Sequence, residues 1–122
     1  MRSGLKSLLV ISILCLTSSA HGQHYDSLRS NSQADLYFKL KWFIYSGGYD
    51  CEEVTKSRFQ GIDSDGNGFI VAACSNGEDY VVMIVDDAVG STKTIPCSEL
   101  AKSGINCWES WRNVIPSEKQ HG

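Results

Sequence analysis

Histidine, proline and basic residues are scarce in this chain. There are three histidines and two prolines among 122 residues, and 11 Lys and Arg residues stand against 14 Asp and Glu residues. This acidic balance excludes a basic stripe of the kind that binds DNA or RNA, so we expect no nucleic-acid partner. Scarce proline and a hydrophobic fraction of 42% exclude a disordered chain. The length suits one small domain and excludes a multidomain enzyme.

Motifs for catalysis are missing as well. The histidines lie in segments that we expect to be tails, where no rigid scaffold would hold a general base. Neighbouring acids in a strand point to opposite faces, so the pairs Glu52-Glu53, Glu78-Asp79 and Asp86-Asp87 do not predict a joint carboxylate site. The chain has no phosphate-binding glycine loop, HExxH or CxxCH motif. We therefore predict no catalytic residue and no cofactor, with a small hydrolase as the alternative.

The first twenty residues have the three parts of a bacterial secretory signal peptide. Basic residues precede an apolar run from Leu8 to Leu16, and Ser18 and Ala20 occupy the small-residue positions before a cleavage site. A second cleavage site follows Gly22. The nine-residue apolar run is too short to span a membrane, which takes about 20 residues. We predict a signal peptide over 1–20, a periplasmic or secreted protein, and no membrane span after cleavage.

Four of the five cysteines remain after the signal peptide, because Cys15 leaves with it. An even number of cysteines in an exported chain indicates a disulfide framework. The spacing includes no CxxC pair, which disfavours a redox motif or a zinc ribbon. The predicted disulfide cysteines are Cys51, Cys74, Cys97 and Cys107.

One helix is predicted over 33–46. Asn31 or Ser32 can cap its start, and Gly47-Gly48 can end it in a left-handed turn. One apolar stripe follows helical spacing, and a second stripe of aromatic residues runs beside it. We expect both stripes to pack in the core, and a ligand-stacking surface is the alternative for the aromatic residues. The first stripe is Leu36, Tyr37, Leu40, Phe43 and Ile44, and the second is Phe38, Trp42 and Tyr45.

Four strands are predicted after the helix, over 52–62, 69–75, 79–85 and 91–97. The first and last are interrupted by charges or proline, which is typical of edge strands, whereas the middle two are apolar on both faces. Asn76-Gly77 predicts a type I′ hairpin turn. Ser98 can cap a helical turn over 99–102, and the segment around Trp108 and Trp111 can cover the open face of the sheet.

The predicted fold is therefore α+β, with one N-terminal helix packed on a four-stranded antiparallel meander and two disulfides. Residues 21–30 are expected to be loose, 31–115 to form the single domain, and 116–122 to be a flexible tail.

Strand register restricts how the cysteines pair. Folding about Asn76-Gly77 puts Cys74 opposite Asp79, and the next turn puts Asp79 opposite Cys97. Cys74 and Cys97 would then lie two strands apart, about 9–10 Å. A disulfide needs Cα atoms within about 7 Å, which disfavours Cys74–Cys97. Cys51 lies on the predicted strand next to that of Cys74 and three strands from Cys97, so the register favours Cys51–Cys74 and Cys97–Cys107.

The turn from Asp63 to Gly68 resembles the start of an EF-hand calcium loop. Asp63, Asp65 and Asn67 occupy its first oxygen-ligand positions, but Cys74 stands where the loop needs a bidentate Glu. The flanking segments are predicted to be strands. These departures favour a polar β-turn over a metal site, and a calcium site of another type is the alternative.

The stretch from Cys51 through Ala73 to Val82 and on to Cys97 resembles a pattern in small exported bacterial proteins of unassigned function. In that pattern a cysteine-ended strand meets an Asn/Asp-Gly turn and a Tyr-x-Val strand. The order of helix and meander is similar to that of PepSY-type domains, which are periplasmic binding or inhibitory modules, although those domains do not depend on disulfides. The resemblance implies a binding module and supplies no site residue.

The sequence thus predicts an exported binding domain with an envelope or extracellular protein as its partner. Exposed edge strands and the aromatic residues Trp108 and Trp111 are the predicted contacts. An inhibitor of a cell-wall hydrolase or of a protease is the alternative within the same class.

Overall fold

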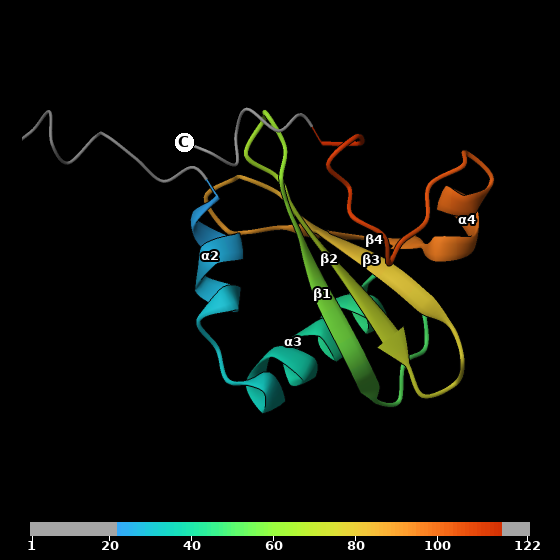
Figure 1. Ribbon diagram of the computed structural model, residues 1–122. Coiled ribbons are helices and arrows are strands. Elements are labelled where there is room, and N and C mark those ends of the chain that lie inside the picture. Colours follow the sequence, from blue (N-terminus) through green and yellow to red (C-terminus); the bar gives the residue numbers. More distant parts are fainter. Residues whose placement is uncertain (1–21, 116–122) are drawn as a thin grey trace, which may run out of the picture.

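The computed structural model describes residues 22–115, so the predicted signal peptide and the predicted 116–122 tail lie outside the described residues. Helices α2 (Gln23–Arg29) and α3 (Gln33–Ser46) precede strands β1 (Val54–Ile62), β2 (Gly68–Cys74), β3 (Asp79–Ile84) and β4 (Thr92–Pro96), and a short helix α4 (Cys97–Ala101) follows. The strands form one antiparallel sheet in the order β1-β2-β3-β4 (Figure 1). The predicted α+β meander is confirmed, and β1 and β4 are its edges.

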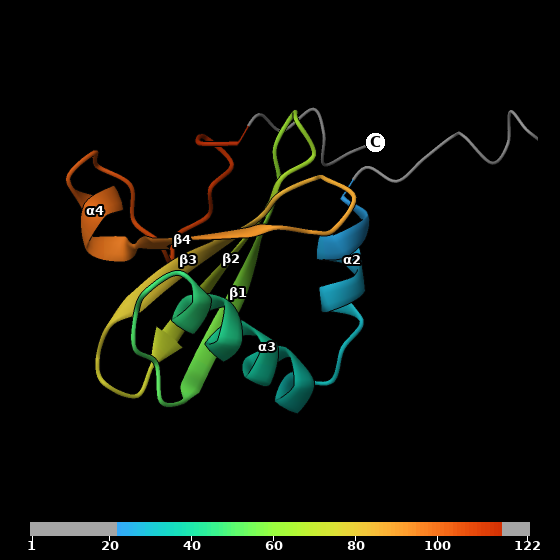
Figure 2. The ribbon, with the colours of Figure 1, turned by 180° about the vertical axis from the view of Figure 1, so that it is seen from behind.

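Helix α3 begins and ends where the sequence predicts. The Ser32 side chain caps its start by accepting a hydrogen bond from the Asp35 backbone N–H at 3.2 Å. At its other end Gly48 takes a left-handed φ of 96°. Leu40 and Ile44 are fully buried against the sheet, which α3 covers on one face (Figure 2).

Helix α2 corrects the prediction of a loose segment over 21–30. Tyr25 and Leu28 lie one helical turn apart, and both are buried in the same core as α3. The Tyr25 hydroxyl accepts a hydrogen bond from the Gly61 N–H at 2.9 Å, and its ring meets Phe59 edge-on. Burial raises the pKa of the Tyr25 hydroxyl. The spacing of Tyr25 and Leu28, one helical turn apart in an otherwise polar segment, is the sequence feature that indicates this helix.

The opposite face of the sheet is covered by the segment that follows α4. Val71 and Val81 are fully buried beneath it, together with Trp111 and Ile115. The sheet therefore lies between helices α2 and α3 on one side and the C-terminal layer on the other. The prediction that this segment covers the open face is confirmed.

Both predicted disulfides are present. Cys51–Cys74 joins the segment before β1 to the end of β2, with a Cα–Cα distance of 5.3 Å. Cys97–Cys107 joins the start of α4 to the C-terminal layer, with a Cα–Cα distance of 5.8 Å. Disulfides persist in oxidising compartments, so the structure indicates a location outside the reducing cytoplasm.

The hairpin between β2 and β3 differs from its prediction. Ala73, not Cys74, lies opposite Asp79. Of the two residues predicted to form the turn, Gly77 has a positive φ and Asn76 does not. The Gly77 N–H donates to the Cys74 carbonyl oxygen at 3.0 Å, which closes a type I turn rather than a type I′ turn. The Asn76 side chain accepts from the Glu78 N–H, which stabilises this three-residue loop. The one-residue error leaves the disulfide argument intact.

Helix α4 also differs in detail. It begins at Cys97, and its N-cap position is Pro96, which makes no side-chain capping bond. Ser98 therefore lies inside the helix, and its predicted capping role is wrong. The disulfide at Cys97 holds the first turn of α4 beside the C-terminal layer.

Candidate functional site

Trp111 belongs to the core. Its side chain is 5% exposed, and its ring centroid lies 5.5 Å from that of Phe69 on β2. The indole N–H donates to the Asn106 carbonyl oxygen at 3.1 Å. Its apolar surface and its polar atom are both used within the domain, so Trp111 is not available as an anchor for a partner.

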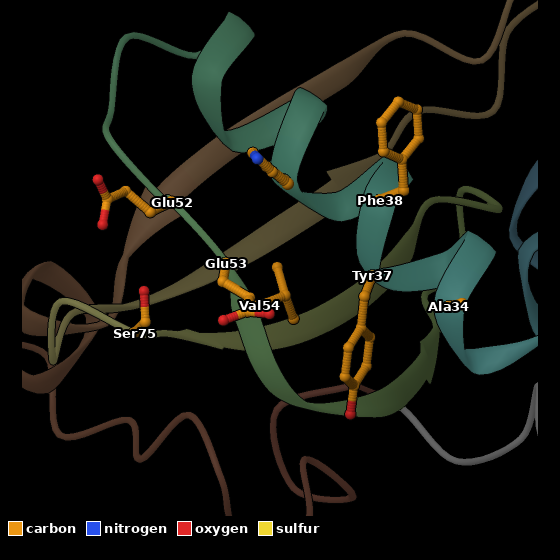
Figure 3. A pocket seen from close by; sticks show the side chains of 8 residues that line it. Ala34, Tyr37, Phe38, Glu52, Glu53, Val54 and Ser75 are labelled. Carbon is orange, nitrogen blue, oxygen red and sulfur yellow. The ribbon is translucent and has the colours of Figure 1, made fainter.

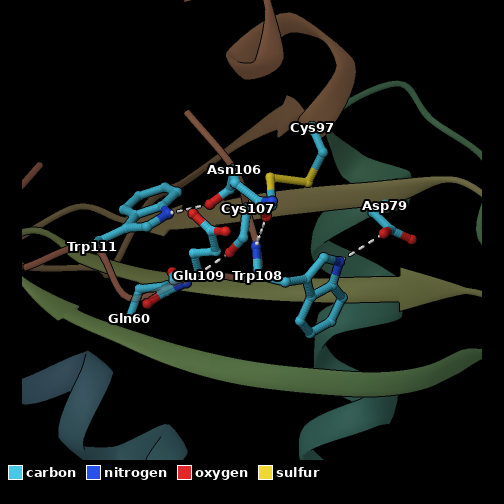
Figure 4. Close-up of a disulfide and its surroundings, with 8 residues drawn as sticks. All are labelled: Gln60, Asp79, Cys97, Asn106, Cys107, Trp108, Glu109 and Trp111. Carbon is cyan, nitrogen blue, oxygen red and sulfur yellow. Dashed lines mark hydrogen bonds between the residues drawn. A yellow bond between two sulfur atoms is a disulfide. The ribbon is translucent and has the colours of Figure 1, made fainter. Parts of the chain in front are cut away.

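Trp108 is half-buried and is held between two charged side chains. Its indole N–H donates to the Asp79 carboxylate at 2.7 Å, and the Lys56 ammonium lies 4.4 Å from the centre of its ring. Gln60 on β1 donates to the carbonyl oxygens of Cys107 and Glu109 on either side (Figure 4). These contacts attach the C-terminal layer to the sheet, so Trp108 has a structural role within the domain.

The EF-hand-like turn is built from its own side chains. One Asp63 carboxylate oxygen accepts from the backbone N–H groups of Asp65 and Asn67, at 2.9 and 3.0 Å. The Asn67 amide oxygen accepts from the Asp86 N–H in the neighbouring loop at 2.9 Å. Among residues 22–115, no group of three or more His, Cys, Asp or Glu side chains is placed to hold a metal ion. The calcium site stays a hypothesis, and the hydrogen bonds account for the turn.

The second aromatic stripe of α3 faces outward. Phe38, Trp42 and Tyr45 are 61%, 50% and 63% exposed, so the prediction that they pack in the core is wrong. Their ring centroids lie 6.2 Å and 5.7 Å apart along the helix, and neighbouring rings meet edge-on at 70° and 89°. We call these three residues the aromatic face. It is exposed because only the first stripe of α3 meets the sheet and no described layer lies beyond the helix.

Two depressions lie beside the aromatic face. One has a volume of about 510 Å³ and runs between α3 and the start of β1 (Figure 3). The other has a volume of about 670 Å³ and lies toward the C-terminal end of α3. Lys41 and Glu52 line both, so the two depressions adjoin. The first is lined by Ala34, Tyr37, Phe38, Lys41, Glu52, Glu53, Val54 and Ser75, and the second by Lys41, Tyr45, Asp50, Cys51, Glu52 and Asn76.

Acidic side chains gather at this end of the sheet. Asp50, Glu52 and Glu53 precede β1, and Glu78 lies in the adjoining hairpin. Burial raises the pKa of the Tyr80 hydroxyl, and the nearby Glu78 and Asp50 carboxylates raise it further. The surface beside the aromatic face is therefore negatively charged.

Searches of protein families, curated proteins and solved structures returned no match to this chain. The resemblance to PepSY-type domains accordingly remains a hypothesis. No helix within residues 22–115 has the length and hydropathy needed to cross a membrane. The main feature of the site is the aromatic face, which the sequence pattern predicts to lie in the core.

Proposed function

We propose that this protein is an exported, non-catalytic binding domain whose aromatic face docks against another protein of the cell envelope or the surroundings. The observation that carries the proposal is the row formed by Phe38, Trp42 and Tyr45, each at least half exposed on one helix. Single exposed apolar residues are ordinary, but adjoining ones of this size are typical of interaction surfaces. Tryptophan and tyrosine are also enriched among the residues that contribute most to protein binding.

The aromatic face is rigidly supported, which lowers the entropy lost on binding. Leu40 and Ile44 fix the opposite side of α3 in the core. The Thr94 hydroxyl on β4 donates to the Phe43 carbonyl oxygen at 3.2 Å, which fastens the C-terminal turn of α3 to the sheet. A partner would meet a preformed surface rather than a loop that must be ordered.

Export is supported by two separate features. The disulfides indicate an oxidising compartment. Residues 1–20 have the pattern of a signal peptide. We therefore place the protein and its partner in the periplasm or in the medium.

Site-specific photo-crosslinking tests the proposed function. A photoreactive phenylalanine analogue replaces Trp42 on the aromatic face, or Glu109 in the C-terminal layer as the matched control, because both side chains are exposed. We expect a crosslink to another protein in envelope extract from position 42 only. Excess unlabelled protein should suppress it, and an excess of the Trp42→Ala variant should not. Equal crosslinking from both positions would reject the aromatic face as the docking surface.

A further inference from the structure

The aromatic face borders a set of acidic residues whose backbone the fold holds in place. We call Asp50, Glu52, Glu53 and Glu78 the acidic rim. The Ser75 N–H donates to the Glu53 carbonyl oxygen at 2.8 Å, and the Asn76 side-chain amide donates to the Asp50 carbonyl oxygen at 3.2 Å. The Cys51–Cys74 disulfide adds a covalent tie between the same two segments. The backbone that carries the rim is therefore fixed to the hairpin between β2 and β3.

Few basic side chains of the domain lie close enough to neutralise the negative charge of the rim. Across residues 22–115, the only ion pair is Lys102–Glu99, which lies on and beside α4. Lys41 is the single basic residue that lines the two depressions, against three of the rim acids. The surface next to the aromatic face thus has surplus negative charge that a positively charged ligand would neutralise.

We infer that the partner presents arginine or lysine side chains, set among apolar ones, to this surface. A guanidinium or ammonium group gains from lying over an aromatic ring within about 6 Å and from hydrogen bonding to a carboxylate. The aromatic face supplies the rings, and the rim supplies the carboxylates. Apolar side chains of the partner would pack against the exposed surfaces of the rings. This inference rests on the proposed function, because it names the partner class for the same surface.

Contacts between a cation and an aromatic ring already occur within the domain. The Lys56 ammonium lies 4.4 Å from the centre of the Trp108 ring, and the Asp79 carboxylate accepts from the same indole at 2.7 Å. A second cation, the Arg29 guanidinium, lies 5.7 Å from the centre of the Phe59 ring. A basic partner would form, between two molecules, the same contact of a cation over an aromatic ring that Lys56 and Trp108 make within one.

The ring geometry favours a protein over a glycan. Sugar rings stack on flat aromatic platforms, but neighbouring rings of the aromatic face are inclined at 70° and 89°. They do not share a plane along which a glycan chain could run. Edge-to-face contacts are a geometry that aromatic groups prefer with one another, and they leave an uneven surface against which irregular side chains can pack.

Fluorescence anisotropy with two synthetic peptides tests the inference. The first is a short fluorescein-labelled peptide of leucine and arginine, and the second has glutamate in place of every arginine. The titrant is the purified exported protein with its disulfides intact. We expect the arginine peptide to bind, more weakly as salt rises, and the glutamate peptide not to bind. The Glu52→Gln/Glu53→Gln variant and the Trp42→Ala variant should each weaken binding about tenfold, a difference of about 1.4 kcal/mol. Glu109→Gln is the matched control and should bind unchanged.

Other outcomes overturn the inference in distinguishable ways. If both peptides bind equally and Trp42→Ala weakens both, the aromatic face binds proteins without charge selection, and the proposed function stands. If neither peptide binds and chitotetraose changes the tryptophan fluorescence, the surface recognises a glycan. If the protein is a dimer that Trp42→Ala dissociates, a second copy covers the face, and the proposed function fails as well. A complete lack of binding rejects the basic partner, and crosslinking from position 42 then decides whether a partner of other chemistry remains.

Discussion

Trp111 and Trp42 are the same residue type in opposite surroundings, 5% and 50% exposed. Trp111 fills the layer between the sheet and the C-terminal segment, whereas the ring of Trp42 contacts its neighbours on the surface of α3. The free energy of unfolding depends on burial of apolar area, so these two residues should contribute to stability very differently.

Truncation of each tryptophan measures this difference. Trp111→Ala should lower the free energy of unfolding by about 3–5 kcal/mol, because it leaves a cavity and an unpaired carbonyl group at Asn106. Trp42→Ala should lower it by less than about 1 kcal/mol. Urea unfolding of both variants checks the prediction. A large loss in Trp42→Ala would mean that the aromatic face serves folding rather than binding.

At Gly68, the ring of Tyr25 leaves no room for a side chain. A Cβ at this position would overlap the ring of Tyr25, which lies across the start of β2. Gly68→Ala should therefore destabilise the domain by about 1–3 kcal/mol through overpacking. In a Tyr25→Ala background the same substitution should cost much less, because the ring that it strikes is gone. Equal costs in the two backgrounds, measured by urea unfolding, would contradict this contact.

At the scale of elements, the loop between β3 and β4 is held by one carboxylate. An Asp87 oxygen accepts from the backbone N–H groups of Val89, Gly90 and Ser91 at 3.1, 2.6 and 3.0 Å. The Ser91 hydroxyl and these amides hold the pKa of Asp87 below its ordinary value of 3.8. The loop also contacts α2, because a ring nitrogen of His24 lies 3.1 Å from the Asp87 carbonyl oxygen.

The lowered pKa predicts an acid-dependent contribution to stability. The charged form of Asp87 is favoured in the fold, so its contribution is present above pH 3.8, the ordinary value, and is lost as the pH falls through the folded-state pKa. The melting temperature of Asp87→Asn should therefore lie below that of the wild type at neutral pH and approach it in acid. Glu109→Gln, an exposed acid elsewhere, serves as the control. A constant difference at all pH values would show that the charge of Asp87 does not matter.

For the whole molecule, the N-terminal end of α2 favours one of the two predicted cleavage sites over the other. Gly22 is buried at the N-cap of α2, and its carbonyl oxygen accepts from the Asp26 N–H at 2.9 Å. Its own N–H donates to the Asp86 carboxylate at 3.4 Å. Cleavage after Gly22 would remove this cap, whereas cleavage after Ala20 retains it. We therefore expect the exported protein to begin at His21.

The intact mass of the exported protein, before and after reduction and alkylation, checks this prediction. The expected mass corresponds to cleavage after Ala20, with four cysteines modified only after reduction. A mass corresponding to cleavage after Gly22 would reject the capping argument alone. An uncleaved chain with free thiols would reject export, and the cysteines would then have to be considered as metal ligands or reactive groups.

Local sequence patterns were sufficient for most of the elements. Helix α3 has a capping serine, an apolar stripe and a terminal pair of glycines, so its bounds follow from contacts within a few residues. The strands follow from apolar runs between turn residues. The cysteine pairing follows because strand spacing separates Cys97 from both Cys74 and Cys51 and leaves Cys51 beside Cys74, and a one-residue error in register does not change that spacing. Each of these conclusions depends on short-range geometry.

Only the tertiary structure decided which surfaces are covered. Both stripes on α3 are apolar, and the sheet buries just one of them, which leaves Phe38, Trp42 and Tyr45 exposed. Tyr25 forms a helix with its neighbours because the pocket over Gly68 receives its ring, a contact across 43 residues of sequence. Trp111 became core because the C-terminal layer returns over β2. Burial depends on what lies opposite a residue in space, which no local pattern of the chain specifies.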